Sequence, residues 1–257
     1  MRILAVGDLV GNAGLKKLEI EYKEIKEREG IDFVIVNGEN VADGMGITEK
    51  DFRRLLDLNV DCVTMGNHTW AKRDIFSFID NPKLIRPANY SENNPGRGYQ
   101  IFECKNKKIA VINLIGRVSM NVLSENPFTV AEVIIEKIRN IVDIIVIDFH
   151  AEATAEKLAL AYFLDGKVEV IFGTHTHVQT ADEQILKNGT AYITDIGMTG
   201  PKESIIGMNK EASIKRFLTS LPERYKIADS EAKLSGCIFE INEETCRITN
   251  IKRINLN

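Results

Sequence analysis

The first forty residues, MRILAVGDLVGNAGLKKLEIEYKEIKEREGIDFVIVNGEN (1–40), contain the pattern that decides the fold. A short apolar run at 3–6 ends in a glycine and an aspartate, and a second apolar run occupies 33–36. Between them apolar residues recur at helical spacing up to Gly30, a suitable C-cap: Leu15, Leu18, Tyr22 and Ile25. This strand–helix–strand order predicts an α/β fold with parallel strand pairing.

The same alternation continues along the chain. Thr48 is predicted to cap the next helix, and further helices are expected near 130–138 and 154–164. Buried strands are predicted at 62–65, 144–149 and 168–172. Antiparallel hairpins are predicted at 99–115, 184–193 and 234–254, and a long surface loop at 81–98. We find no repeat or linker, so we predict a single domain over 1–257.

Composition excludes several classes of protein. The chain has 257 residues, of which 44% are apolar and 27% charged, as in globular domains. Its net charge of -4 provides no basic field for long nucleic acids or anionic lipids. The four cysteines have no metal-type spacing and form no disulfide framework, which favours a reducing cytoplasm. No segment approaches the roughly 20 apolar residues of a membrane span. We therefore expect a soluble cytoplasmic protein.

Polar side chains of metal-ligand type follow the apolar strands. In an open α/β sheet such groups gather beyond the carboxyl ends of the strands, where ligands bind. All four histidines of the chain belong to this set: Asp8, Glu39, Asn40, Asn67, His68, His150, His175 and His177. The positions of the histidines therefore predict one shared site.

The chemistry of this set indicates the kind of metal. Carboxylates, amides and imidazoles are oxygen and nitrogen ligands that suit Mn, Fe or Zn. The supply exceeds the needs of one tetrahedral ion and points to two ions with a bridging carboxylate, the usual arrangement for phosphoester hydrolysis. If the segment around His175 and His177 is extended, both side chains lie on one face and can serve neighbouring ions.

The spelling of the motifs resembles a known family. The order Asp, Gly-Asn-His, His and Gly-x-His-x-His resembles the calcineurin-like metallophosphoesterases. The motifs are GDLVGNAG (7–14), NGEN (37–40), GNHTW (66–70), DFHAEATAEK (148–157), GTHTHVQTAD (173–182) and DIGMTGP (195–201). Together they are similar to the YmdB family of bacterial cyclic-nucleotide phosphodiesterases, over residues 3 to about 201.

The resemblance implies a fold and a ligand set. The fold would be a β-sandwich of mixed sheets flanked by helices, in four layers (αββα). The superfamily's usual histidine two residues after Asp8 is missing, and Glu39 stands where an aspartate is usual. The resemblance implies that Asn40 fills the vacancy. One ion would be held by Asp8, Glu39, Asn40 and His177, and the other by Glu39, Asn67, His150 and His175.

The resemblance also implies an activity. A metal-bridging hydroxide would attack phosphorus, and His68 would act as general acid. The substrates would be small cyclic nucleotides, 2′,3′-cyclic monophosphates in particular, and the ions Fe or Mn, or else Zn. Homo-oligomers are implied as well. The rival functions are a phosphomonoesterase, nucleotidase or nuclease of the same fold, and a regulatory protein whose hydrolysis is incidental.

Several residues keep two interpretations. Each histidine is either a ligand or a hydrogen-bonded core residue, and His68 is either the acid or a further ligand or phosphate contact. Trp70 either stacks on a nucleobase or packs in the core. Thr154 either supports substrate or caps the following helix. Glu152 and Lys157 are candidates for substrate contacts or for support of the metal ligands.

Overall fold

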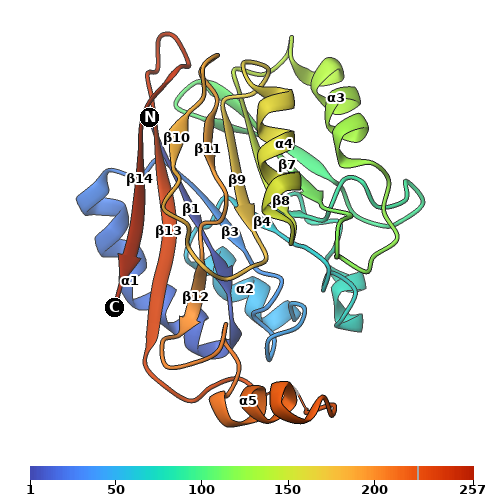
Figure 1. Cartoon of the computed structure of the whole chain (residues 1–257). Helices are drawn as coiled ribbons and strands as arrows, with labels where there is room; N and C mark the ends of the chain where they lie inside the picture. The colour runs from blue at the N-terminus through green and yellow to red at the C-terminus, as the bar shows by residue number, and fades with distance from the viewer. Residues whose placement is uncertain (225) are drawn as a thin grey trace.

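The computed structural model describes residues 1–224 and 226–257, and two β-sheets packed face to face form its centre (Figure 1). The first sheet has the order β2-β12-β13-β1-β3-β4-β5, with β14 paired to β13. Its strands are β1 (Arg2–Val6), β2 (Asp8–Leu9), β3 (Phe33–Asn37), β4 (Cys62–Thr64), β5 (Leu84–Ile85), β12 (Met198–Pro201), β13 (Ala232–Ile241) and β14 (Ile248–Leu256).

The second sheet has the order β10-β11-β9-β8-β7-β6. Its strands are β6 (Tyr99–Cys104), β7 (Lys107–Ile115), β8 (Ile144–His150), β9 (Val170–Thr174), β10 (Gln184–Ile185) and β11 (Ala191–Ile193). The helices are α1 (Gly11–Glu29), α2 (Glu49–Asp57), α3 (Pro127–Ile138), α4 (Thr154–Leu164) and α5 (Lys210–Thr219), with a 3₁₀ turn η1 at Arg73–Ser77.

The predicted strand pairing is confirmed. Strands β1, β3, β4 and β5 pair in parallel, and so do β7, β8, β9 and β11. The three hairpins are antiparallel, as expected: β6 with β7, β10 with β11, and β13 with β14. Both sheets are therefore mixed, and in each of them the central strands end on one edge.

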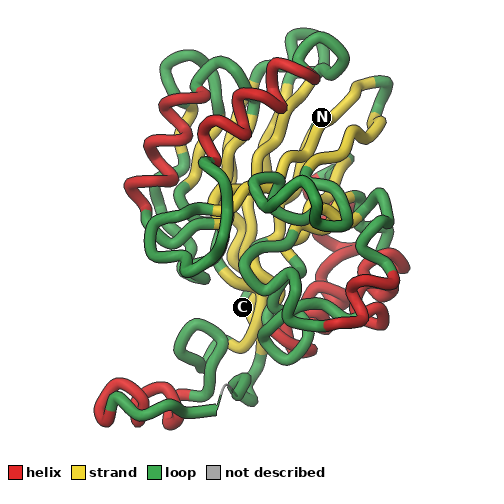
Figure 2. The backbone as a smooth tube through the Cα atoms, turned by 90° about the vertical axis from the view of Figure 1, so that its right-hand side faces the viewer, coloured by secondary structure: helices red, strands yellow, loops and turns green. Residues whose placement is uncertain are grey.

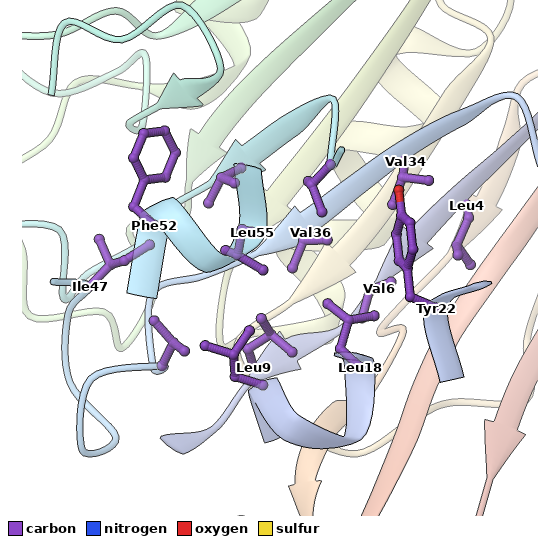
Figure 3. Close-up of a cluster of buried hydrophobic side chains, with 14 of the residues drawn as sticks. Leu4, Val6, Leu9, Leu18, Tyr22, Val34, Val36, Ile47, Phe52 and Leu55 are labelled. Atoms are coloured by element: carbon purple, nitrogen blue, oxygen red, sulfur yellow. The ribbon is translucent and has the colours of Figure 1, made fainter. Parts of the chain in front are cut away.

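Alternating side chains divide the first sheet between two cores. Leu4 and Val6 of β1 face α1 and α2, whereas Ile3 and Ala5 face the second sheet. Figure 3 shows the helix-facing cluster, where Leu18 and Tyr22 of α1 lie over the strands. The outer face of the second sheet is covered by α3 and α4. The predicted four-layer αββα sandwich is confirmed.

Local signals in the sequence also match the structure. Thr48 caps α2, since its side chain accepts a hydrogen bond from the backbone of Asp51. Gly30 ends α1 in the left-handed conformation that favours glycine. Among the described residues, no helix is both long and apolar enough to cross a membrane.

The predicted surface loop at 81–98 is wrong in its first half. Leu84 and Ile85 are fully buried and form β5, the last parallel strand of the first sheet. Arg86 is also buried, and its guanidinium donates to backbone carbonyls of the same segment. Two apolar residues among prolines and polar residues are too short a run to predict a strand, so the pairing with β4 decides the structure here.

A segment between β12 and β13 was not predicted as structured, yet it contains α5. Figure 2 shows this helix and its connections standing away from the body of the molecule. Its apolar side chains are largely in solvent: Ile214 is 49% exposed, Phe217 80% and Leu218 80%. Among the described residues, α5 therefore packs its apolar side chains on no surface comparable to the sheets that α1 to α4 cover.

Candidate metal centre

The predicted ligands come together at the carboxyl ends of the strands. Asp8 begins β2, Glu39 and Asn40 follow β3, and Asn67 and His68 follow β4. His150 is the last residue of β8, and His175 and His177 follow β9. Contacts between Glu39 and His150 join the two sheets here. The structure thus places all four histidines at one site, as the sequence predicts.

One group of ligand atoms surrounds the buried imidazole of His150. Its Nε2 lies 3.0 Å from Glu39 Oε1, 2.9 Å from Asn67 Oδ1 and 3.1 Å from His175 Nδ1. One ligand atom each of Glu39, His150 and His175 lies within 4.8 Å of the others. The spacing and type of these atoms are those of a metal-binding group.

A second group of polar atoms also contacts Glu39. Asn40 Nδ2 is 3.2 Å from Glu39 Oε1 and 3.1 Å from His177 Nε2, and Asp8 Oδ1 is 3.7 Å from the same His177 nitrogen. Asp8 is fully buried, and none of the described residues hydrogen-bonds to its Oδ1. A buried carboxylate oxygen without a donor costs free energy that a cation at this point would offset. The residues present therefore fit a metal ion.

Hydrogen bonds behind His150 orient its ring. The hydroxyl of Thr174 donates to Asp148 Oδ1 at 2.7 Å, so its oxygen accepts from Nδ1 of His150 at 2.9 Å. With the Nδ1 proton fixed there, Nε2 faces Glu39 and Asn67. A ligating histidine commonly donates its other ring nitrogen to such a partner.

The other two histidines of the groups are oriented in the same way. Nδ1 of His177 donates to the carbonyl of Ile206 at 2.9 Å, and Nε2 of His175 lies 3.1 Å from Glu152 Oε2. Each contact takes one ring nitrogen and turns the other, Nε2 of His177 and Nδ1 of His175, toward the ligand groups. Three imidazoles thus turn a ring nitrogen toward one small volume.

Burial and neighbouring charges shift the pKa values of the ligands. Burial raises the pKa of Asp8, against the attraction of His177 and His150. Burial also acts to raise the pKa of Glu39, but His150 and His68 together bring it well below its usual value. Burial acts to lower the pKa of His150, and Glu39 and Asp8 overcome this and raise it to about 9. The carboxylates of Glu39 and Asp8 thus favour a proton on His150. A metal ion bound at the same place would displace that proton.

His175 has the opposite protonation. Its burial, and then the nearby charge of His150, lower its pKa to about 3. The ring is therefore neutral near pH 7, which is the form that binds metals. Its single proton can sit on Nε2 beside Glu152, so that Nδ1 stays free for a ligand role.

The expected geometry of the His-x-His segment is wrong. His175 and His177 lie beyond the end of β9, and both have positive φ, 97° and 65°. The chain turns sharply instead of continuing as an extended strand, so the two rings do not simply share a face. His175 turns to His150, and His177 turns to Asp8 and Asn40.

Trp70 and Thr154 are not brought to the ligands. The Trp70 ring stacks on Phe76 with centroids 5.6 Å apart, and it packs against the core as well, in line with the packing interpretation. Thr154 is exposed at the start of α4. The predicted capping role of Thr154 is wrong, because Ala153 occupies the cap position and no side chain caps that helix.

Glu152 and Lys157 fall in different places. Glu152 is beside His175, as described above, and lines the pocket over the ligands. Lys157 is fully buried, and its Nζ donates to the Thr174 carbonyl and to Asp195 Oδ2, both at 2.8 Å. Lys157 therefore supports the segment that carries His175.

Sequence reasoning missed the residues that support the ligands. Asp148 accepts hydrogen bonds from Thr64 and Thr174, and Asp195 accepts from the backbone and hydroxyl of Thr176. Asp148 and Asp195 are fully buried. A charged residue inside an apolar strand, such as Asp148 in IIVIDFH (144–150), is the signal that could have identified one of them.

A pocket of about 230 Å³ opens over the ligand groups. His68 stands at its side, where its backbone N–H donates to Glu39 Oε2 at 3.0 Å and its Nδ1 lies 2.8 Å from Asn40 Oδ1. None of the described residues hydrogen-bonds to Nε2 of His68. The other lining residues are Glu39, Asn40, Gly44, Glu152, His175, Thr176, His177, Ile206 and Met208.

Comparison with known proteins gives consistent matches along the whole chain. The model of a family described as YmdB-like protein matches residues 4–254. A 2′,3′-cyclic-nucleotide 2′-phosphodiesterase of Bacillus subtilis (strain 168) is 47% identical over 100% of this chain and 97% of its own. The crystal structure of a novel phosphatase from Mycoplasma pneumoniae is 38% identical with a TM-score of 0.94, over 100% of this chain and 93% of that one. The structure of a hypothetical protein from Thermus thermophilus is 34% identical with a TM-score of 0.94, over 99% and 98% of the two chains.

Proposed function

The chain belongs to the YmdB-like family of phosphodiesterases and phosphatases, and from this premise we propose that it hydrolyses 2′,3′-cyclic nucleotides at a two-metal centre. The name of the 47% identical relative supports both the substrate class and the bond that breaks, the one between phosphorus and O2′. Water supplies the new oxygen on phosphorus, and the product is the 3′-phosphate with a free 2′-hydroxyl.

The shared position of Glu39 carries the proposal of two metals. Its Oε1 contacts both groups, at 3.0 Å from Nε2 of His150 and 3.2 Å from Nδ2 of Asn40. We propose that Asp8, Glu39, Asn40 and His177 hold one ion, and that Glu39, Asn67, His150 and His175 hold the other. Ions of the Fe, Mn or Zn type suit these ligands. When bound, such a pair neutralises phosphate oxygens and lowers the pKa of water.

His68 is the proposed general acid toward O2′. In its ligand role Asn40 would present Oδ1 to the metal, which requires its amide to turn from the orientation described above, so that Nδ2 in place of Oδ1 faces Nδ1 of His68. That nitrogen then accepts a hydrogen bond, and the proton of a neutral His68 is placed on Nε2, on the side of the pocket. Asn40 would thus select the His68 tautomer that can protonate the leaving oxygen.

A substrate panel tests the activity. We expect the purified protein with Mn²⁺ to convert 2′,3′-cyclic AMP to adenosine 3′-phosphate, identified by chromatography against both isomers. Faster turnover of p-nitrophenyl phosphate or of RNA than of cyclic nucleotide would support a phosphomonoesterase or a nuclease instead. Release of the 2′-phosphate would contradict the proposed bond.

Replacing Glu39 tests the metal pair. We expect protein purified without chelators to contain close to two transition-metal equivalents per chain, and Glu39→Gln to contain at most one. Turnover should fall by at least about 100-fold, because the amide no longer bridges two cations. Glu103→Gln, an exposed position on β6, is the matched control and should keep both properties. Two equivalents in Glu39→Gln would contradict the bridging role.

We also propose that the chain forms homo-oligomers. The exposed Phe217 and Leu218 of α5 support this, because large apolar side chains gathered on a projecting helix usually mark an interaction surface. Light scattering coupled to gel filtration should give a multiple of the 28.9 kDa chain mass. A monomer at that mass would contradict the proposal.

A further inference from the structure

A two-residue turn forms one side of the pocket over the ligand groups. The backbones of Ile205 and Met208 exchange two hydrogen bonds of 2.9 Å, so Ile206 and Gly207 occupy the corners. Both corners have positive φ, 47° at Ile206 and 99° at Gly207. These values describe a tight hairpin turn of the mirror-image kind.

Turn chemistry explains the glycine and leaves the isoleucine unexplained. A Cβ at Gly207 would lie 2.7 Å from Val10, so a side chain has no room there. The first corner of such a turn favours asparagine, aspartate or glycine, and a β-branched residue at positive φ is strained. Asparagine at position 206 would therefore adopt this backbone conformation with less strain. The presence of isoleucine suggests that its side chain has a role other than forming the turn.

Ile206 contributes one of the two apolar side chains among the residues that line the pocket. Ile206 is 50% exposed, and it lines the pocket together with Met208. The remaining lining residues are polar apart from Gly44. The backbone carbonyl of Ile206 accepts from Nδ1 of His177, so this apolar surface lies directly beside one group of proposed ligands.

We propose that Ile206, together with Met208, is the specificity surface on which the nucleobase of the substrate packs. A nucleotide has a charged phosphodiester for the ligand groups and a base whose apolar ring face matches the two apolar side chains of the lining. The turn is anchored from behind, since Gly207 donates to Ser204 and accepts from Ala228. The surface is therefore fixed before substrate arrives. This inference rests on the proposed cyclic-nucleotide activity.

The test compares 2′,3′-cyclic AMP with its abasic analogue, methyl ribofuranoside 2′,3′-cyclic phosphate. We expect Ile206→Asn to reduce the preference for the nucleotide over the abasic analogue by roughly 10-fold, mainly through KM for the nucleotide. Its melting temperature should be equal to or above that of the wild type, because asparagine tolerates the backbone conformation. Metal content should match the wild type, since the carbonyl to His177 remains.

Two further variants keep the result interpretable. Ile206→Val retains an apolar surface and should keep most of the preference. Ile141→Asn changes a similarly exposed isoleucine, at 56%, that precedes β8 at the end away from His150, and should leave the preference unchanged. An unchanged preference in Ile206→Asn, or an equal loss for both substrates, would overturn the inference. Failure of the wild-type protein to hydrolyse either diester would overturn the proposed function instead.

Discussion

His150 and His177 face the same site, but different kinds of structure hold the two rings. His150 is the last residue of β8 and is fully buried, and so are its hydrogen-bond partner Thr174 and Asp148, which accepts from Thr174. His177 lies outside the strands with positive φ, and its partner is the carbonyl of Ile206 in a half-exposed turn. We call these the inner and the outer side of the centre, and we place His68 and Glu152 with the outer side.

The difference indicates that the two sides of the centre have different structural roles. The inner side is set by the same packing that joins the two sheets, so it is as rigid as the core. The outer side is formed by turns that make few contacts with the hydrophobic core. Such turns can carry the side chains that contact substrate. We therefore expect changes on the inner side to affect metal and stability. Changes to outer residues that hold no ion, such as His68 and Glu152, should affect turnover or substrate preference.

The largest effect on turnover that leaves metal in place should come from His68→Ala. Loss of a general acid is expected to reduce kcat by about 10²–10⁴. Metal content should remain that of the wild type, because His68 is 31% exposed on the outer side and belongs to neither ligand group. His150→Ala is the contrasting variant from the inner side and should lose metal as well as activity. Loss of metal from His68→Ala would make His68 a ligand and break the division.

Thr174→Val tests the inner side more gently. Valine keeps the volume but leaves the Nδ1 proton of His150 and an oxygen of Asp148 without their shared partner. We expect about 1–3 kcal/mol of lost stability in denaturant unfolding. Metal affinity, measured by competition with a chelator, should fall about 10–100-fold.

The matched control for that variant is Thr249→Val on β14. The hydroxyl of Thr249 also donates one hydrogen bond, to the backbone carbonyl of Glu240 at 3.2 Å, but this residue is exposed. Stability should stay within about 0.5 kcal/mol of the wild type. Equal effects of the two substitutions would show that burial behind His150 contributes nothing.

The sequence predicts the inner side better than the outer one. Buried strands such as 33–36 and 144–147 are continuous apolar runs, and the positions of the polar residues beyond them follow from where the strands end. Parallel pairing within each sheet places Glu39 and His150 at the carboxyl ends of their strands, and the packing of the two sheets then brings them together. For this reason the pairing and the meeting place of the ligands could be predicted from the strands, whereas the four layers were implied by the family resemblance.

The outer side depends on backbone turns that periodicity does not encode. The positive φ of His175 and His177 contradicted an extended segment, and the turn at Ile206 has an isoleucine where turn preferences favour asparagine.

The hydrogen-bond network of Asp148 and Asp195 was also missed, because a buried carboxylate becomes recognisable only when its donors are brought to it from distant strands.

The smallest effect should come from Glu152→Gln. The carboxylate of Glu152 lies 3.1 Å from Nε2 of His175, but its side chain is 52% exposed, so water and salt screen its charge. The amide oxygen of glutamine can still accept the Nε2 proton and keep the ring oriented. We expect kcat/KM to change by less than about 5-fold, and the change to shrink as ionic strength rises. A loss of 100-fold with reduced metal content would mean that His175 depends on Glu152 as His150 depends on Thr174. His175 would then belong to the inner side. The orientation of each histidine ring would depend on its hydrogen-bond partner rather than on how deeply the ring is buried.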